Sequence, residues 1–398
     1  MSIHPIASRL PHMSKANTVA GNVESGQVPG LVALIYRNGQ TEVQALGVQT
    51  LGGTPIARDS IFRIASLTKP IAAVAAMTLV EEGRIQLDAS VDYWLPELAN
   101  RQVLRQVDGP LADTVPAKRA ITLRDLLTMR LGMGHIMAQV DHYPIRKALT
   151  EVGLLLGPPA PDTTPHPDEW MRRLGSLPLM YQPGEKWLYD LGTDILGVLI
   201  ARVANQPLGE FMRERIFEPL GMKDTAFYVP AAKLPRLVTA YRRDREQNQL
   251  IVIDPAEDGQ WTREPAFPSA SGGLVSTADD YLAFCQMMLN RGTLGHARIL
   301  SPETVEHMTS DQLTSEQRKE NALFFGDHSS WAMGMAVDIA ASGHEHHLGR
   351  FGWSGGFGTT AATDPSNKLI GILMTQVAMD SPMGPQVFHD FWTEAYKS

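Results

Sequence analysis

A serine and a lysine three positions apart are the first side chains in this sequence of 398 residues that could perform covalent chemistry. Ser66 and Lys69 form the segment SLTK just before residues 71–83, an alanine-rich stretch that is apolar on nearly all sides and ends at Gly83. This pattern predicts a buried helix closed by a glycine. Residues i and i+3 share one helical face, so the lysine amine can reach the serine hydroxyl.

The predicted place of Lys69, near the start of a helix, indicates what its amine would do. The positive end of the helix dipole and the loss of water both disfavour the ammonium form, so we expect Lys69 to lose proton affinity. It could then act as a base or hydrogen-bond organiser toward Ser66. The alternative is a helix-capping serine beside a solvated lysine, because S-x-x-K recurs by chance. A strand-like segment before the motif and a buried helix after it favour the nucleophile.

A second serine, Ser354, lies in GWSGG at residues 352–356 and matches G-x-S-x-G, the nucleophile elbow of α/β-hydrolases. The elbow requires a helix directly after the serine, whereas residues 357–363 are rich in Gly and Thr and strand-like. It also requires a downstream acid and histidine, and the one histidine that follows, His389, falls on a predicted terminal helix. We therefore favour Ser66 over Ser354 as the nucleophile.

Other reactive residue types lack the spacing of a cofactor site. The sequence HEHH at residues 344–347 has no H-E-x-x-H pattern, so we expect an exposed hairpin there and no metal site. Phosphate-binding glycine motifs are also missing, and we expect no cofactor. The single cysteine, Cys285, lies in an apolar helical pattern, which predicts a buried and inert thiol.

Composition excludes several classes of protein. With 43% hydrophobic and 20% charged residues, the chain can bury a core and is not a disordered polymer. A formal net charge of −8, from 35 Lys and Arg against 43 Asp and Glu, argues against a nucleic-acid partner. No window is apolar enough to span a membrane, and the first residues lack the apolar region of a secretory signal, so we expect a cytoplasmic protein without a membrane partner.

Strand patterns occur near both ends of the chain. Two apolar runs flank Asn38 and Gly39, a strong hairpin signal. Strand patterns return near the C-terminus and a terminal helix follows; the segments concerned are 331–337, 358–363, 369–375 and the helix 385–396. We predict an α/β (α+β) fold whose antiparallel sheet is built from both chain ends and has flanking helices.

Helical patterns dominate the middle of the chain, for example at residues 123–129 and 193–203. We therefore divide the chain into an α/β part, residues 1–90 and 270–398, and an inserted, mainly helical part, residues 91–269. A long irregular insertion is expected near residues 130–175, where prolines cluster. Ligands usually bind at the junction of two such parts.

Three segments together resemble a known superfamily: residues 62–71 (FRIASLTKPI), 182–190 (QPGEKWLYD) and 351–358 (FGWSGGFG). They are similar to the serine β-lactamases and penicillin-binding proteins, most of all to the family VIII carboxylesterases related to class C β-lactamases. The similarity runs from about residue 20 to the C-terminus and includes residues 217–225 and 271–277. It implies the β-lactamase-like fold.

The resemblance also implies roles for individual residues. Ser66 would be the acylated nucleophile and Lys69 its partner. Tyr189 begins the element that reads Y-x-N in the lactamases and would be the base. The backbone N–H groups of Ser66 and Gly356 would form the oxyanion hole.

Two departures from the lactamase pattern concern the substrate. The lactamase element K-T-G is here Trp353, Ser354 and Gly355, which replaces a cation with an indole. Leu191 stands where an asparagine would contact the amide of a substrate. Both changes favour neutral, apolar acyl groups at these substrate-binding positions.

We therefore predict a serine hydrolase that cleaves carboxylic esters of short to medium acyl chains, with a small-molecule ester as its partner. Within the superfamily, a β-lactamase, a D-Ala-D-Ala peptidase-like amide hydrolase and an acyltransferase remain alternatives. A binding or sensor protein without catalysis is the alternative from a different class.

Overall fold

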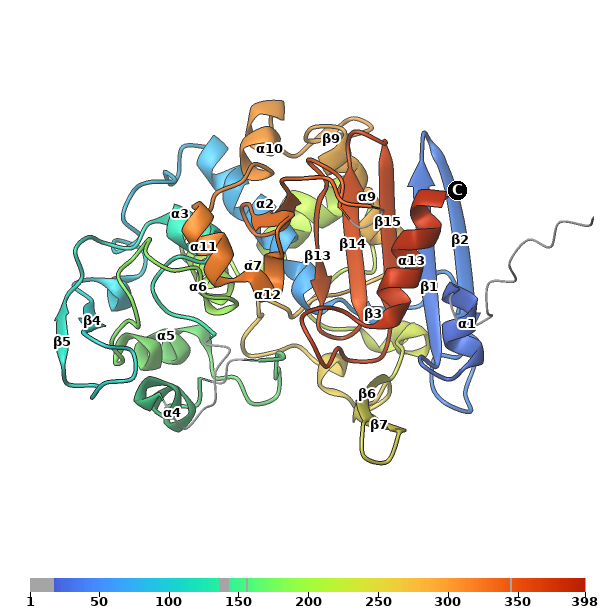
Figure 1. Ribbon diagram of the computed structural model, residues 1–398, viewed down its shortest axis with the longest axis horizontal. Coiled ribbons are helices and arrows are strands. Elements are labelled where there is room, and N and C mark those ends of the chain that lie inside the picture. The colour runs from blue at the N-terminus through green and yellow to red at the C-terminus, as the bar shows by residue number, and fades with distance from the viewer. Residues whose placement is uncertain (1–17, 136–142, 155–156, 344–345, 398) are drawn as a thin grey trace, which may run out of the picture.

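The computed structural model of the protein describes residues 18–135, 143–154, 157–343 and 346–397. Its largest sheet has seven antiparallel strands in the order β11-β12-β13-β14-β15-β1-β2 (Figure 1). These strands are β1 (Gly30–Arg37), β2 (Gln40–Gly47), β11 (Ser329–Trp331), β12 (Ala336–Asp338), β13 (Phe351–Gly355), β14 (Thr359–Asp364) and β15 (Leu369–Thr375). Strand β1 pairs with β15 along its length, so the sheet is built from both chain ends, as predicted.

Apolar side chains on β1 alternate between the two faces of the sheet. Leu31 and Ala33 belong to one cluster with α13, whereas Val32 and Leu34 belong to the main core. Helices α1 and α13 cover the first face, and α9 packs against the second (Figure 1). The described helices of the α/β part include α1 (Val19–Glu24), α2 (Thr68–Glu81), α9 (Ala278–Leu289), α10 (Pro302–Met308) and α13 (Gln386–Lys397), and two short helices between α10 and β11 are described with the site below. A strand covered on both faces needs apolar residues at successive positions, which explains the continuous apolar run in β15.

Helix α2 is the predicted buried helix, and it starts at Thr68, three residues before the predicted start. Twelve of its 14 residues are buried, which matches a sequence that is apolar on nearly all sides. Gly83 follows the helix with a φ of 69°, a conformation that glycine adopts without strain. A single 3-10 turn, Ala65–Leu67, leads directly into α2.

The middle of the chain contains most of the remaining helices. They are α3 (Leu123–Leu127), α4 (Pro144–Glu151), α5 (Pro167–Gly175), α6 (Leu191–Ala204), α7 (Leu208–Met212), a π-helical turn (Arg213–Phe217) and α8 (Glu218–Leu220). Helices α4 and α5 lie within residues 130–175, where we expected irregular chain. Both begin at a proline, because the first helical position needs no N–H donor. Pro144 and Pro167 therefore mark helix starts, whereas Pro158, Pro159, Pro161 and Pro165 lie in irregular chain as expected.

Short antiparallel pairs interrupt the predicted helical part. They are β4 (Gln102–Leu104) with β5 (Thr114–Pro116) and β6 (Ala240–Asp244) with β7 (Gln249–Asp254). Tyr241 of β6 bonds to the segment just after β15, so this hairpin lies against the α/β part. Two further pairs are β3 (Phe62–Arg63) with β8 (Val275–Ser276) and β9 (Thr293–Leu294) with β10 (Ala297–Arg298).

Residues 331–337, predicted as one strand, form the ends of β11 and β12 and the tight turn between them. Gly334 has a φ of 77° in this turn. A Cβ atom at Gly334 would lie 3.0 Å from the carbonyl oxygen of Lys69. Glycine therefore allows both the turn and its close approach to α2.

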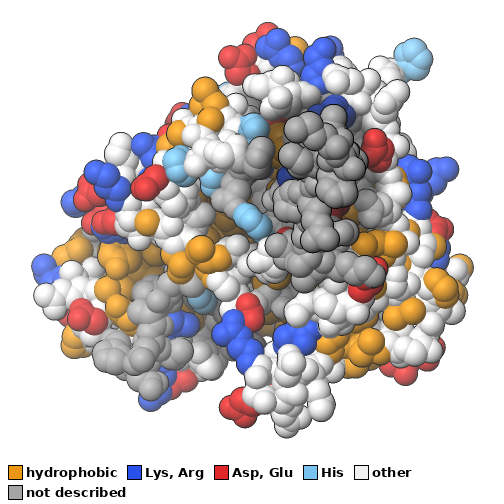
Figure 2. Space-filling model, turned by 45° about the vertical axis from the view of Figure 1, so that its right-hand side comes forward, with side chains coloured by type: hydrophobic (Ala, Val, Ile, Leu, Met, Phe, Trp, Pro, Cys, Tyr) orange, Lys and Arg blue, Asp and Glu red, His pale blue; other side chains and the backbone are white. Residues whose placement is uncertain are grey.

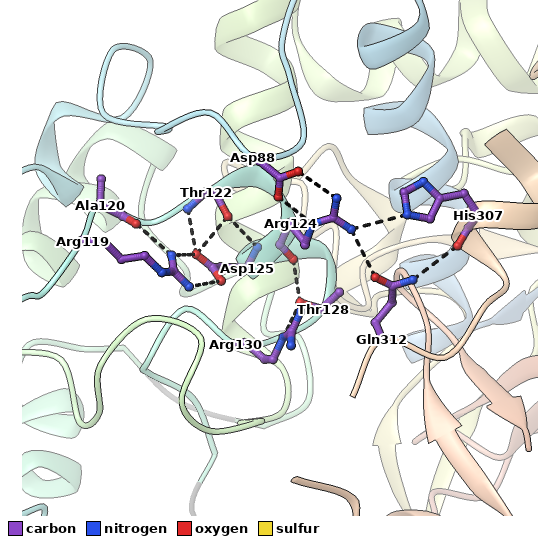
Figure 3. Close-up of polar contacts among 10 residues, drawn as sticks. All are labelled: Asp88, Arg119, Ala120, Thr122, Arg124, Asp125, Thr128, Arg130, His307 and Gln312. Atoms are coloured by element: carbon purple, nitrogen blue, oxygen red, sulfur yellow. Dashed lines mark hydrogen bonds and ion pairs between the residues drawn. The ribbon is translucent and has the colours of Figure 1, made fainter. Parts of the chain in front are cut away.

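A polar network holds the start of α3 and the chain that follows it (Figure 3). Thr122 and Asp125 form a capping box, and Arg119 donates to both oxygens of Asp125. Arg124 pairs with Asp88 and also donates to Gln312, whose backbone N–H bonds to β11. The network thus joins the helical part to the edge of the large sheet.

Basic and acidic side chains are interspersed on the face shown in Figure 2. None of the described helices is both long enough and apolar enough to cross a membrane.

Candidate active site

Ser66 lies in the 3-10 turn between β3 and α2 and is half-buried. The residue before it, Ala65, has a φ of 45°, in the left-handed region that an alanine seldom adopts. Such a conformation costs about 1–3 kcal/mol and persists only where the surrounding structure imposes it. The turn therefore presents Ser66 at the price of backbone strain, as functional sites often do.

Lys69 is completely buried and has three hydrogen-bond acceptors. Its Nζ lies 3.0 Å from Oγ of Ser66, 3.0 Å from Oδ1 of Asp190 and 2.7 Å from the carbonyl oxygen of Ser271. An ammonium has three N–H donors, so these three acceptors use all of them. The predicted contact between Lys69 and Ser66 is present, and it is part of a larger arrangement.

The pKa of Lys69 moves opposite to our expectation. Burial lowers its pKa, but the neighbouring side chains of Tyr189 and Asp190 raise it, and the net shift is upward. The prediction that Lys69 loses proton affinity was wrong, because it considered the dipole and desolvation without the anionic partners. Lys69 is therefore a cation that donates a hydrogen bond to Ser66.

Tyr189 and Asp190 enter the site at the start of α6. Asp190 has φ and ψ of 86° and −69°, a strained conformation for a residue other than glycine. The carbonyl of Tyr189 accepts a hydrogen bond from the N–H of His135, which fixes the chain just before this bend. The Nζ of Lys69 lies 4.6 Å from the centre of the Tyr189 ring, within cation–π range.

Trp353 on β13 contacts the same tyrosine. Its indole Nε1 donates to the Tyr189 hydroxyl oxygen at 2.7 Å. Trp353, which the resemblance aligns with the lactamase lysine, supplies an N–H donor without a positive charge. Tyr189 is linked to Trp353 through its hydroxyl and to Lys69 through its ring.

Strand β13 passes close to the 3-10 turn that carries Ser66. A Cβ atom at Gly355 would collide with the carbonyl oxygen of Ile64, so only glycine permits this approach. Strand β12 pairs with β13 at Phe351 and Gly352 only. Within the described residues, the later part of β13 has no partner strand on that side, and its edge is open toward the site.

The N–H groups predicted for the oxyanion hole are accessible in this arrangement. Gly356 follows β13, is exposed, and would place a Cβ within 4 Å of no heavy atom of the described residues. Among the described residues, no backbone carbonyl accepts a hydrogen bond from the N–H of Ser66 or Gly356. Both donors are therefore free to bind an oxygen of a substrate, and their role stays a prediction.

Aromatic side chains surround Tyr189. Phe324, on the short helix α12 (Ala322–Phe325), stacks on it with ring centres 5.5 Å apart. Trp353 packs 5.7 Å from Tyr189 and 4.8 Å from Trp331. Helix α11 (Ser315–Glu320) precedes α12, and its Gln317 donates to two carbonyls just before Trp187. The site therefore has an apolar wall beside its polar centre.

Two predicted substrate-binding residues, Leu191 and Ser354, have no hydrogen bond to Ser66, Lys69 or Tyr189 among the described residues. Leu191, the first residue of α6, is buried in the main core. Ser354 is half-buried, and its hydroxyl donates to Oγ1 of Thr360 on β14 at 3.0 Å. No lysine or histidine contacts Ser354 among the described residues, in contrast to Ser66. The contacts of both residues with a substrate stay predictions.

The remaining reactive residues lie outside this site. His344 falls outside the described residues, whereas His346 bonds to Asp338 at 3.1 Å and is only partly exposed, contrary to the exposed hairpin we predicted. The described residues contain no group of three or more His, Cys, Asp or Glu side chains that could hold a metal ion. Cys285 is buried, and burial raises the pKa of its thiol to about 12, as expected for an inert cysteine.

Sequence reasoning missed three residues of this site: Asp190, Asp194 and Ser271. Asp190 follows Tyr189 directly, and Asp194 lies one helical turn later on the same face, so spacing alone could have suggested them. Ser271 begins one of the segments that carry the resemblance, residues 271–277, but its spacing gives no sign of a contact with Lys69, 202 positions away.

The arrangement suits attack by a serine on a carbonyl carbon. It combines a hydroxyl, a buried cation, a phenol held by an N–H donor, and two unused backbone N–H groups.

Comparison with known proteins agrees with this chemistry. The model of the beta-lactamase family matches residues 16–385. The chain belongs to the beta-lactamase family. It is 37% identical over 368 residues to protein Rv1367c of Mycobacterium tuberculosis, covering 90% of this chain and 88% of the relative. It is 31% identical over 377 residues to esterase EstB of Burkholderia gladioli, covering 89% and 88%.

Comparison with a solved structure shows that the similarity of this beta-lactamase family member includes its fold. EstCE1, a hydrolase with promiscuous acyltransferase activity, is 25% identical, gives a TM-score of 0.80, and is matched over 95% of this chain and 96% of its own. The predicted fold class and the resemblance to the esterase branch are confirmed. The protein is a serine hydrolase of the β-lactamase-like type.

Proposed function

We propose that this beta-lactamase family protein hydrolyses carboxylic esters of short to medium acyl chains through an ester on Ser66. The contact of the Lys69 ammonium with Ser66, beside Tyr189, carries this proposal. The esterase activity named for EstB supports it.

The hydrogen bonds of Lys69 determine where the serine proton goes. Because Lys69 donates to Ser66, it does not accept the Ser66 proton in this state. We propose that Tyr189, as a phenolate, accepts this proton. The N–H of Trp353 bonds to its oxygen and the ammonium of Lys69 lies over its ring, and both contacts stabilise the negative charge of a phenolate.

The reaction then proceeds in two balanced halves. Ser66 Oγ adds to the ester carbonyl carbon, Tyr189 takes the hydroxyl proton, and the N–H groups of Ser66 and Gly356 bind the oxyanion. The bond to the alkoxide breaks, and the alkoxide leaves with the proton from Tyr189. Water repeats the same steps on the acyl-serine and releases the acid.

Trp353 accounts for selectivity toward neutral substrates. A β-lactam brings a carboxylate, and an indole offers it no cation, so each hydrogen bond left unmade would cost about 1–3 kcal/mol. A simple ester has no such group, and its acyl chain can pack on aromatic surface at about 0.8 kcal/mol for each buried methylene.

A panel of p-nitrophenyl esters of graded chain length, assayed beside nitrocefin, tests the proposal. We expect kcat/KM for the butyrate to exceed that for nitrocefin by at least about 10²-fold. The variant Trp353→Lys should weaken ester turnover and reduce the difference in kcat/KM between the butyrate and nitrocefin. Equal efficiency on both substrates would favour a β-lactamase, and failure of a fluorophosphonate to label Ser66 would favour a binding protein.

Acyl transfer is a second candidate, because EstCE1 combines hydrolysis with promiscuous acyltransferase activity. Both outcomes share the acyl-Ser66 intermediate and differ only in whether water or an alcohol attacks it. Adding increasing concentrations of a primary alcohol to the butyrate assay separates them. A transferase would form the new ester at the expense of butyric acid, whereas a strict hydrolase would yield the acid alone.

A further inference from the structure

Asp194 lies on α6 one helical turn after Asp190, on the side of the helix that faces Lys69. Its carboxylate accepts three hydrogen bonds from one short segment. Oδ1 accepts from Oγ of Ser269 at 2.8 Å and from the backbone N–H of Ser271 at 2.9 Å, and Oδ2 accepts from Oγ of Ser271 at 3.0 Å. A single carboxylate thus holds both ends of residues 269–271.

The same segment supplies one of the three acceptors of Lys69. The N–H of Ser271 points to Asp194, and its carbonyl oxygen receives Lys69 at 2.7 Å. Holding the N–H and the side chain of one residue leaves little freedom for its carbonyl. Asp194 is therefore connected to Lys69 through a single residue.

The chain around Ser271 needs such an anchor. Residues 269–273 belong to no helix or strand, and two of them are the consecutive glycines Gly272 and Gly273. Glycine restricts the backbone less than any other residue, so hydrogen bonds must fix this segment. Besides those to Asp194, the N–H groups of Gly272 and Gly273 donate to the carbonyl of Ser269, and the indole of Trp261 donates to the carbonyl of Gly273. Apart from a hydrogen bond between the hydroxyls of Ser269 and Ser271, their side chains bond only to Asp194 among the described residues.

Among the described residues, the charged groups that act most strongly on Asp194 are Lys69 from α2 and Asp190 from the start of α6, while residues 269–271 contribute neutral donors. Asp194 has no direct hydrogen bond to Lys69, so its influence on the reaction must pass through Ser271 or through space.

We propose that Asp194 is a positioning residue for the reaction at Ser66: its carboxylate orients residues 269–271 so that the carbonyl of Ser271 holds the ammonium of Lys69 in place. This inference rests on the proposed function, since it assigns a role in the reaction of Ser66.

Two substitutions at Asp194 separate its effect on the position of residues 269–271 from a general effect on folding. Asp194→Asn keeps one oxygen for Ser269 and the Ser271 N–H, and its amide can donate to the Ser271 hydroxyl. Asp194→Ala removes all three contacts. We expect Asp194→Ala to lower kcat by about tenfold or more with KM changed by less than about threefold, and Asp194→Asn to retain kcat within about threefold.

Asp280 provides a matched control. It is a buried carboxylate on α9 that accepts from the backbone N–H of Asp224 at 2.7 Å and from the hydroxyl of Thr225 at 2.9 Å, with no link to Lys69. Asp280→Ala should lower the melting temperature and leave kcat per labelled Ser66 unchanged. A merely structural Asp194 would behave in the same way, and that result would overturn the proposal.

A second pair of measurements keeps the proposal testable if Asp194→Ala does not fold or if esters are not the substrate. The double variant Ser269→Ala, Ser271→Ala removes two of the three donors and should lower kcat by about threefold to tenfold; wild-type kcat in this variant would overturn the proposal. The rate at which a fluorophosphonate labels Ser66 reports its reactivity without ester turnover. Slower labelling in Asp194→Ala supports the proposal even if the ester panel fails, and equal labelling contradicts it.

Discussion

Arg63 and Lys69 are two buried cations six positions apart, yet the structure surrounds them differently. The side chain of Arg63 is 1% exposed and bonds to Asp254, which is 3% exposed, and to the carbonyls of Val238 and Pro255. Lys69 is equally buried, but its partner Asp190 is 16% exposed and its partner Ser66 is half-buried. Arg63 is enclosed together with its carboxylate partner, whereas two of the partners of Lys69, Asp190 and Ser66, reach toward solvent.

The pKa values of the two cations also shift in opposite directions. Burial lowers the pKa of Arg63 although Asp254 opposes that shift. Burial acts on Lys69 as well, but Tyr189 and Asp190 raise its pKa overall. A buried cation is therefore no mark of a catalytic site in itself. The distinguishing feature is a hydroxyl among its partners that a substrate could reach.

Removal of the Ser66 hydroxyl has the largest expected effect on activity. Ser66→Ala removes the group that sets Lys69 apart from Arg63 and should abolish ester turnover. Ser354→Ala removes only a hydrogen bond between β13 and β14, so it should keep measurable activity. Initial rates with p-nitrophenyl butyrate measure both. Activity in Ser66→Ala together with its loss in Ser354→Ala would reverse the assignment of the nucleophile.

Removing each cation should separate activity from stability. Lys69→Met should lower kcat by about 10²-fold or more, the usual scale for a positioned catalytic group. Arg63→Met leaves the buried carboxylate of Asp254 without its charged partner and, among the described residues, with only the hydrogen bond from the N–H of Gln260, and breaking such a pair typically costs about 3–5 kcal/mol of unfolding free energy. Urea denaturation and kcat per labelled Ser66 give the two readouts. If Arg63→Met lowers kcat as much as Lys69→Met does, the contrast between the two cations fails.

Tyr189→Phe tests the third member of the site and should also lower kcat by about 10²-fold or more. It removes the oxygen that accepts from Trp353 and leaves the ring beside Lys69. Tyr241→Phe is the control, because the hydroxyl of this buried tyrosine accepts a hydrogen bond from the N–H of Leu51, which follows β2, and has none to Ser66, Lys69 or Tyr189. Near wild-type kcat in Tyr189→Phe would remove Tyr189 from the mechanism.

The smallest expected effect is a pH dependence of stability that differs in sign between two carboxylates. Burial and the neighbouring Asp190 raise the pKa of Asp194 to about 6, so its ionised form disfavours folding. The unfolding free energy of the wild type, relative to Asp194→Asn, should therefore fall as the pH rises from about 4 to about 6 and stay constant above.

Asp224 should show the opposite slope. Its hydrogen bond to Arg236 lowers its pKa to about 2, so it stabilises the fold above about pH 4, and this stabilisation is lost as the pH falls toward 2. Urea denaturation across this range, with Asp194→Asn and Asp224→Asn, gives both slopes. Slopes of the same sign would contradict the environments assigned to these carboxylates.

The sequence by itself determined the features that depend on neighbouring residues. The pairing of Ser66 with Lys69 follows from helical spacing, and the burial of α2 follows from its apolar composition. The strands at both chain ends follow from their apolar runs and the Asn-Gly turn. Each of these signals lies within a few residues, where local sterics decide the outcome.

Tertiary structure decided how the site is charged and which surfaces are open. The shift of the Lys69 pKa is a sum over burial and the side chains of Tyr189, Asp190 and Asp194, and the Asp190 contact alone spans 121 positions, so no local pattern contains that sum. The open edge of β13 depends on where β12 stops pairing, and the contact between Trp353 and Tyr189 joins residues 164 positions apart. Electrostatic effects and close packing act across space, so they arise only once the chain has brought these residues together.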